Sequence, residues 1–125
     1  MNDKSIADKM YLKNARSLAI FNGQVHPAVT AQMPQQLLDA DAPDGVDVAL
    51  IFALNQAQME QYFPEAMARL GEKGSLWIAY LKHSAPKATD INRDIIYTWA
   101  KLHGATGVAM ISVDADWSAV RLKRL

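Results

Sequence analysis

Four stretches of nearly continuous hydrophobic residues stand out along the chain. They lie at 17–23, 46–54, 75–82 and 107–114. A strand that is covered on both faces, as in a parallel sheet, is apolar at almost every position, whereas a half-exposed strand alternates. We therefore expect four buried strands at these positions.

The segment between the second and third strands, residues 55–74, has the period of a helix. Its apolar positions fall at i, i+3, i+4, i+7, i+8 and i+11, namely Met59, Tyr62, Phe63, Ala66, Met67 and Leu70. That spacing places them on one face of a helix. Pro64 lies inside the pattern, so we expect either a kink there or two short helices. Gly71 and Gly74 should end the segment.

A second helical pattern follows the third strand. Its apolar stripe consists of Ile91, Ile95, Trp99 and Leu102. Thr89 or Asp90 is expected to be the N-cap, because both types have a short side chain that accepts a bond from a free N–H group of the first turn. Gly104 should lie just past the end of this helix.

The two ends of the chain give weaker patterns. Residues 4–11 can form a short amphipathic helix, and residues 28–41 are ambiguous, although Pro34 can begin a helical turn that runs through Leu38. Residues 117–125 alternate between apolar and basic side chains after a two-residue turn. So short a turn makes this last strand an antiparallel neighbour of the strand before it.

The order strand, helix, strand, helix, strand predicts crossover connections and a parallel sheet. We expect one α/β domain spanning residues 1–125, a three-layer sandwich of Rossmann-like type. Its sheet should have about five strands and be mostly parallel, with a C-terminal antiparallel hairpin at or near one edge.

Composition narrows the classes of protein that fit. The 125 residues are 50% hydrophobic and 21% charged, which is typical of a globular chain rather than a disordered one. The formal net charge is zero, so we expect no general attraction to nucleic acid or to an anionic membrane. No cysteine is present, no signal peptide is recognisable, and the apolar runs are too short to cross a bilayer. These features favour a cytoplasmic protein.

Polar residues gather where the expected strands end. In an open parallel sheet, ligands bind outside the carboxyl ends of the strands. The candidates for a ligand site at this edge are Asn22, Lys82, His83, Thr89, Asp90, Asn92, Arg93, Asp114 and Trp117. His26 and Asp116 also fall at strand ends.

Two explanations for these charges remain open, besides a partner interface. Asp90 and Asp94 near a helix N-terminus complement the helix dipole, with Lys82 or Arg93 present only to neutralise them. Alternatively, Lys82 and Arg93 converge with the exposed N–H groups of the helix on an anion such as phosphate or carboxylate.

Motifs for a cofactor, a metal or a nucleophile are missing. The chain has neither a G-x-G-x-x-G nor a Walker-A run, and "NGQVHP" after the first strand has one glycine where a dinucleotide or adenosylmethionine loop normally has two or three. No metal-ligand spacing and no nucleophile elbow are present either. We therefore predict no cofactor, no metal site and no catalytic residue.

Three motifs in the second half carry a family resemblance. "GSLWIAYLK" contains Trp77, Tyr80 and Lys82, "TDINRD" spans residues 89–94, and "DADWSAVR" spans residues 114–121. This combination resembles the DUF3052 family, small bacterial proteins of unknown function. The family usually has proline where Leu81 stands. The resemblance implies a cut-down class I methyltransferase core that lacks the glycine-rich adenosylmethionine loop.

Three functional hypotheses follow from these observations. The leading one is a non-catalytic, degenerate methyltransferase-like module that binds a small anionic ligand or a protein partner. The first alternative is a transferase with a modified nucleotide or adenosylmethionine site at the strand ends. The second is a structural homo-oligomer that buries its hairpin edge.

Overall fold

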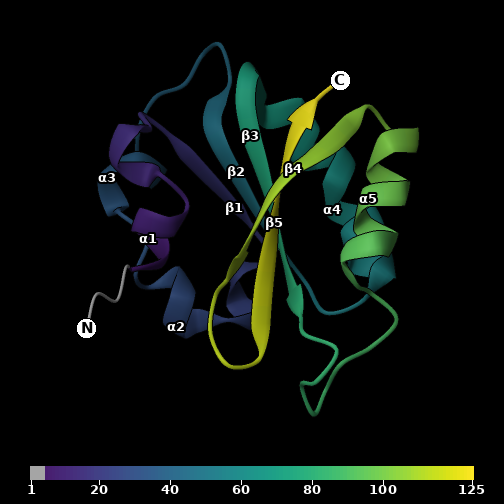
Figure 1. Ribbon diagram of the computed structural model, residues 1–125. Coiled ribbons are helices and arrows are strands. Elements are labelled where there is room, and N and C mark those ends of the chain that lie inside the picture. Colours follow the sequence, from purple (N-terminus) through teal and green to yellow (C-terminus); the bar gives the residue numbers. More distant parts are fainter. Residues whose placement is uncertain (1–4) are drawn as a thin grey trace.

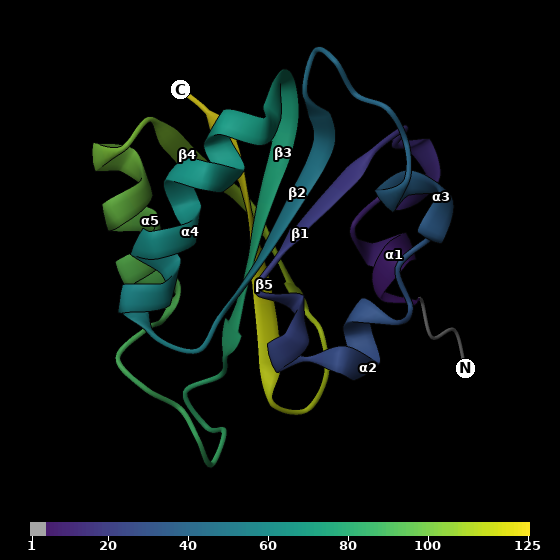
Figure 2. The same ribbon diagram turned by 180° about the vertical axis from the view of Figure 1, so that it is seen from behind.

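The computed structural model describes residues 5–125 and contains one five-stranded sheet between two layers of helices (Figures 1 and 2). The strands are β1 (Leu18–Phe21), β2 (Val46–Ala53), β3 (Leu70–Leu81), β4 (Ala105–Ser112) and β5 (Trp117–Arg124). The helices are α1 (Ile6–Lys9), α2 (Pro27–Thr30), α3 (Gln35–Leu38), α4 (Gln56–Arg69) and α5 (Arg93–Leu102). Two short 3-10 turns, η1 (Leu12–Asn14) and η2 (Gly23–Val25), complete them.

The sheet is mixed, which corrects the expectation of a mostly parallel one. Its order is β1-β2-β3-β5-β4. β1 pairs with β2 and β2 with β3 in parallel, whereas β5 is antiparallel to both β3 and β4. The short turn did predict an antiparallel hairpin. The length of the turn does not predict that β5 lies between β3 and β4. Because it does, half of the strand pairs are antiparallel and β4 is the edge strand.

The helices cover opposite faces of the sheet and bury a separate core on each. The core beneath α4 and α5 includes Ile51 and Ile78, and the core beneath α1, α2 and α3 includes Phe52 and Trp77. Alternate residues of one strand therefore enter alternate cores, which explains why the strand sequences are apolar without interruption. β4, at the edge, instead alternates between covered and exposed positions.

α4 is one continuous helix with Pro64 inside it, so the two-helix alternative is wrong. Gly71 and Gly74 do not end it. The helix stops at Arg69, and Leu70 already has an extended backbone that begins β3. Gly74 is instead needed for close packing, because a Cβ atom there would lie 2.5 Å from a Leu70 side-chain carbon and 2.9 Å from the Val46 carbonyl oxygen.

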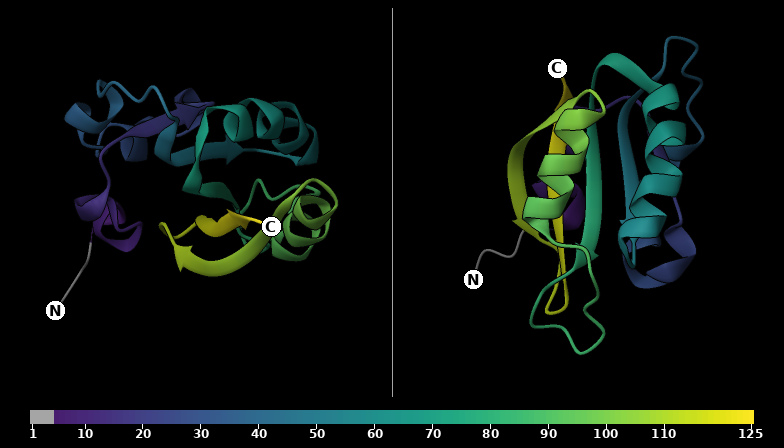
Figure 3. Two further views of the ribbon diagram at one scale, coloured as in Figure 1. Left: turned by 90° about the horizontal axis from the view of Figure 1, so that it is seen from above. Right: turned by 90° about the vertical axis from the view of Figure 1, so that its right-hand side faces the viewer.

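α5 differs from its prediction in its cap and in its buried face. The N-cap is Asn92, whose Oδ1 accepts a 2.9 Å bond from Ile95 N–H, and not Thr89 or Asp90. The residues fully buried within it are Ile96 and Ala100, whereas Leu102 is 77% exposed. The apolar arc is wide because α5 packs on the sheet and also beside α4, as Figure 3 shows. The predicted stripe, which ends at Leu102, lies along one side of this wide apolar face.

The N-terminal segments match their weaker predictions. Ile6 and Met10 are buried around α1, and Lys4, the first residue of the predicted helix, lies outside the described residues. The ambiguous region contains two single-turn helices, and Pro34 is the N-cap of the second.

Gly104 follows α5 with φ of +93°, as expected for a glycine that ends a helix. None of the helices among residues 5–125 is long and apolar enough to span a membrane.

Candidate functional site

The carboxyl ends of β1, β2, β3 and β4 meet at one edge of the sheet, which we call the rim (Figure 1). The chain leaves β1 toward the α2 and α3 layer, but it leaves β2 toward the α4 and α5 layer. A crevice forms where neighbouring connections diverge in this way, and ligands of open α/β sheets bind there. The rim is therefore where the fold itself places a candidate site.

The β4–β5 hairpin is tied to the rim through Asp114. One carboxylate oxygen accepts bonds of 2.8 Å from the backbone N–H groups of Asp116 and Trp117, and the other lies 2.8 Å from His26 Nε2. Partial burial raises the pKa of Asp114, but the bonds from His26 and from the two N–H groups outweigh it and hold the pKa below 3.8, its ordinary value. Asp114 is thus an ionised acceptor at neutral pH.

An aromatic cluster lies beside this carboxylate. The Trp117 ring is 5.2 Å from the His26 ring and 5.9 Å from the Phe52 ring, measured between centroids. His26 therefore joins the loop after β1 to the hairpin by a polar bond and by ring packing. The sequence placed His26 at a strand end but did not indicate that it pairs with Asp114.

Lys82 is fixed against the other side of the hairpin. Its Nζ donates to Ser112 Oγ at 2.9 Å and to the Asp114 backbone carbonyl at 2.7 Å. Its backbone N–H donates to the Asp116 carbonyl at 2.7 Å. Lys82 therefore connects the end of β3 to both ends of the turn.

Asn22 is occupied by structural bonds. Its Nδ2 donates to the Phe52 carbonyl at 2.8 Å and to Gln58 Oε1 at 3.0 Å, and its Oδ1 accepts from Gln24 at 2.8 Å. It is buried and has a left-handed backbone, with φ of +64°. Asn22 therefore fastens β1 to β2 and to α4, and both polar atoms of its side chain already have protein partners.

Thr89 and Asp90 also make bonds to protein groups. Thr89 Oγ1 donates to the Leu54 carbonyl at 2.5 Å, and Asp90 Oδ1 accepts from Gln56 N–H at 2.9 Å, in the first turn of α4. These two bonds tie the loop between β3 and α5, residues 82–92, to the end of β2. Both side chains hold the loop in place.

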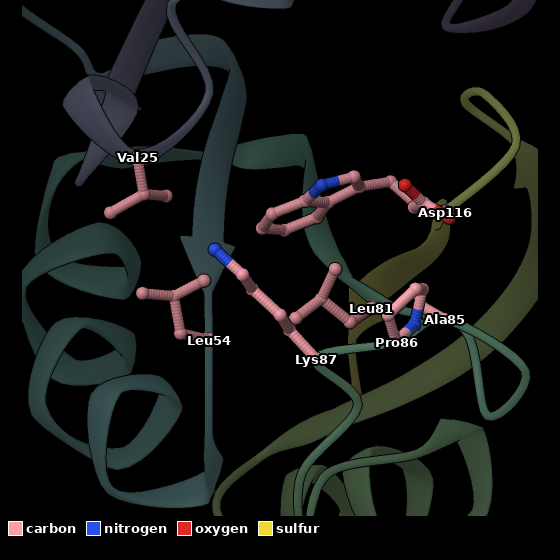
Figure 4. Close-up of a pocket in the computed structure, with 8 residues that line it drawn as sticks. Val25, Leu54, Leu81, Ala85, Pro86, Lys87 and Asp116 are labelled. Carbon is pink, nitrogen blue, oxygen red and sulfur yellow. The ribbon is translucent and has the colours of Figure 1, made fainter.

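One cavity at the rim, which we call the indole cavity, has a volume of about 530 Å³. Its wall consists of Val25, Leu54, Leu81, Ala85, Pro86, Lys87, Asp116 and Trp117. In Figure 4 the Lys87 ammonium group reaches between Val25 and Leu54, and Asp116 lies at the opposite side. This cavity is mostly apolar, and its charged wall residues are one cation, Lys87, and one anion, Asp116.

The second cavity, which we call the basic cavity, lies on the α5 side of the same rim and has a volume of about 320 Å³. Its wall consists of Tyr80, Lys82, His83, Asn92, Arg93, Asp94, Met110 and Ser118. Four of the predicted residues therefore line the basic cavity, namely Lys82, His83, Asn92 and Arg93. Trp117 lines the indole cavity instead, and the Asp114 carboxylate faces His26.

Sequence reasoning missed Lys87. It lies in a loop of small residues, "SAPKA", without a neighbouring motif, and only the fold shows that its side chain enters a cavity. Within residues 5–125, no cluster of three or more histidine and carboxylate side chains is arranged to hold a metal ion.

Solved structures of similar fold include proteins bound to adenosylmethionine (SAM), its product SAH, or sinefungin. LepI in complex with SAM has a TM-score of 0.56 at 11% identity, covering 96% of this chain and 39% of LepI. The glycopeptide N-methyltransferase MtfA with sinefungin has a TM-score of 0.56 at 11% identity, covering 97% and 93%. SMU.1697c, a candidate methyltransferase from Streptococcus mutans with SAH, has a TM-score of 0.52 at 12% identity, covering 100% of both chains.

At these identities the likeness extends to the fold alone, which is an α/β methyltransferase-like fold. This chain spans well under half the length of LepI. No curated protein matches the sequence. The family described as "Protein of unknown function (DUF3052)" matches residues 21–125, which include both cavities of the rim. The chain therefore belongs to the DUF3052 family.

Proposed function

We propose that this protein is a non-catalytic binding module of methyltransferase-like fold, and that it takes a small anionic ligand with an apolar body in the indole cavity. The observation that carries the proposal is Lys87. Its ammonium group extends into a cavity of about 530 Å³ and forms no ion pair within residues 5–125. A charge in an apolar-walled site binds an opposite charge more strongly than it would in open water.

The walls favour a ligand with a flat or acyl body. Trp117 is buried and presents one side to the cavity, and Leu54 and Leu81 line it from the ends of β2 and β3. Small-molecule sites are typically concave and apolar, with a few polar groups that fix the orientation of the ligand. We expect the carboxylate or phosphate of the ligand to contact Lys87 and its body to contact the indole.

The loop after β1 supports binding without methyl transfer. Thr30 Oγ1 lies within hydrogen-bond distance of the carbonyls of Gly23 and His26, at 2.8 and 3.0 Å, and its hydroxyl group donates to them. The polar groups of this loop therefore bond to one another. α2 has only four residues, and its N-cap position is His26 rather than a glycine. A pyrophosphate or methionine cradle needs glycines that let the ligand approach the backbone, and this loop has one.

A matched pair of probes tests the proposal. Benzoate and its neutral isostere benzamide would be titrated against the wild-type protein by calorimetry and by thermal shift. We expect benzoate to bind more tightly, because only benzoate pairs with Lys87. A ligand present at a hundred times its Kd stabilises a fold by about 2.7 kcal/mol, which raises the Tm by several degrees.

Variants of two lysines complete the test. Lys87→Gln should weaken benzoate about tenfold to a hundredfold and leave benzamide unchanged, which corresponds to about 1.4–2.8 kcal/mol. Lys101→Gln, on the exposed surface of α5, is the charge-matched control and should change neither. An equal loss of benzoate affinity in the two variants would contradict a specific site at Lys87. Micromolar binding of SAM with a methylated product would overturn the non-catalytic proposal.

A further inference from the structure

The basic cavity combines three nitrogen bases with a single carboxylate. Lys82, His83 and Arg93 line it, and Asp94 is the acidic residue among its wall residues. With His83 neutral, the fixed charges are two positive and one negative, so the cavity has a local charge of +1 in a chain whose formal net charge is zero. This charge is localised at the rim and does not reflect a generally basic protein.

Lys82 enters the cavity in a fixed orientation. Two of its three N–H bonds are directed to Ser112 Oγ and to the Asp114 carbonyl. The third N–H group has no acceptor among residues 5–125, and the entropy of ordering the side chain is already lost in the folded protein. A ligand that binds Lys82 does not have to immobilise it.

Arg93 has most of its donors available. It contacts Asp94 only through Nε at 3.4 Å, and both side chains are more than half exposed, at 51% and 83%. Solvent weakens the attraction within such an exposed pair. The two terminal nitrogens of the guanidinium group have no hydrogen-bond partner among residues 5–125, and they can form the bidentate contact that arginine makes with phosphate.

The remaining wall adds neutral donors at the start of α5. Asn92 accepts the N–H groups of Ile95 and Ile96, through Oδ1 and its backbone carbonyl, while those of Arg93 and Asp94 have no partner among residues 5–125. Burial raises the pKa of Tyr80, although Arg93 opposes this, so the phenol remains protonated at neutral pH, and its hydroxyl group donates to Met110 Sδ at 3.5 Å. Ser118 supplies a further hydroxyl group.

We propose that the basic cavity is a binding site for a tetrahedral oxyanion, either inorganic phosphate or the phosphate group of a phosphomonoester, held by Arg93 and Lys82. This site is separate from the indole cavity, because it lies on the other face of the sheet and shares none of the wall residues. It goes beyond the function proposed above and stands without it.

The test is calorimetric titration with inorganic phosphate and, in a second arm, with phenyl phosphate, at ionic strength held constant with chloride. Arg93→Gln should raise the Kd for both by about tenfold or more. Asp94→Asn should lower the Kd severalfold, because it removes the carboxylate that repels the ligand. Arg93 and Asp94 are exposed, so neither variant is expected to unfold the protein.

Two controls separate this site from general charge effects and from the indole cavity. Lys101→Gln removes one positive charge from the other end of α5 and should leave the phosphate Kd unchanged, as should Lys87→Gln. Tighter binding of phenyl phosphate than of phosphate would identify a phosphomonoester as the source, and equal binding would identify free phosphate. Absence of saturable binding, or equal effects of Arg93→Gln and Lys101→Gln, would overturn the proposal.

Discussion

The two cavities share one rim and one loop but are built from different kinds of residue. The indole cavity is walled by side chains that also belong to a core, such as Trp117 and Leu81. The basic cavity is walled largely by exposed groups, such as His83 and Arg93. The difference means that the shape of the first depends on the stability of the protein, whereas the charge of the second can be changed almost independently of stability.

The largest effect that would test this contrast comes from Trp117→Ala. Trp117 is 7% exposed and packs against Phe52 and His26. Its removal leaves a void and should lower the free energy of unfolding by about 3–5 kcal/mol. Chemical denaturation measures this loss, and Trp117→Phe, which retains a ring, should lose less. A loss below about 1 kcal/mol for Trp117→Ala would mean that the indole is not part of the core.

A smaller effect is expected from Asp114, which joins the hairpin to the rim. Asp114→Ala removes the acceptor of two backbone N–H groups and of His26. Its side chain is 39% exposed, so solvent screening reduces the loss to about 1–2 kcal/mol. Asp114→Asn keeps an acceptor for the turn and should lose less.

The decrease in the free energy of unfolding caused by Asp114→Ala should depend on pH. The pKa of Asp114 is lowered in the folded state, so its ionised form stabilises the fold above the unfolded pKa, near 3.8. This stabilisation disappears as the pH falls through the lower, folded pKa. Denaturation curves of wild type and variant should therefore differ at pH 6 and converge in strong acid. A difference that persists unchanged in acid would show that the carboxylate charge is not responsible.

The smallest effect is expected from Arg93→Gln. Arg93 contacts Asp94 through a single exposed pair at 3.4 Å. Removing it should change the free energy of unfolding by no more than about 0.5 kcal/mol. Thermal denaturation is a sufficient measurement. A loss comparable with that of Trp117→Ala would end the distinction between a cavity formed by the core and one formed by surface charges.

The sequence predicted the strands well, because a strand buried on both faces is apolar at nearly every position. β2 spans Val46–Ala53, within one residue of the prediction. The end of α4 was less predictable. Glycine is common both after helices and in tightly packed strands, and Gly74 belongs to the second kind. The place of β5 in the sheet was not encoded in any local pattern, since the turn requires only that β5 follow β4 as its neighbour.

The sequence indicated which polar residues lie near one another at the strand ends, but not which partners they bond. Polar groups gather at strand ends in such a sheet, and Lys82 and Arg93 do line the same cavity. Asn22, Thr89 and Asp90 obey the same rule and yet are occupied by bonds to Phe52, Leu54 and Gln56. A sequence shows which side chains can bind a ligand. It does not show which of them the protein already uses for its own backbone, because those partners lie about thirty residues away or more.

β4 is the edge strand next to β5 (Figure 3), and among its residues Val108 and Met110 are about half exposed. An uncovered edge of this kind is a template on which another chain can add a strand. The register shift between Gly107 and Ala109 interrupts it and leaves two short runs, 105–107 and 109–112, instead of one ladder of eight residues. An incoming strand would lose its hydrogen-bonding register at this irregularity. This irregularity in β4 therefore makes that edge of the sheet a poorer template for an added strand.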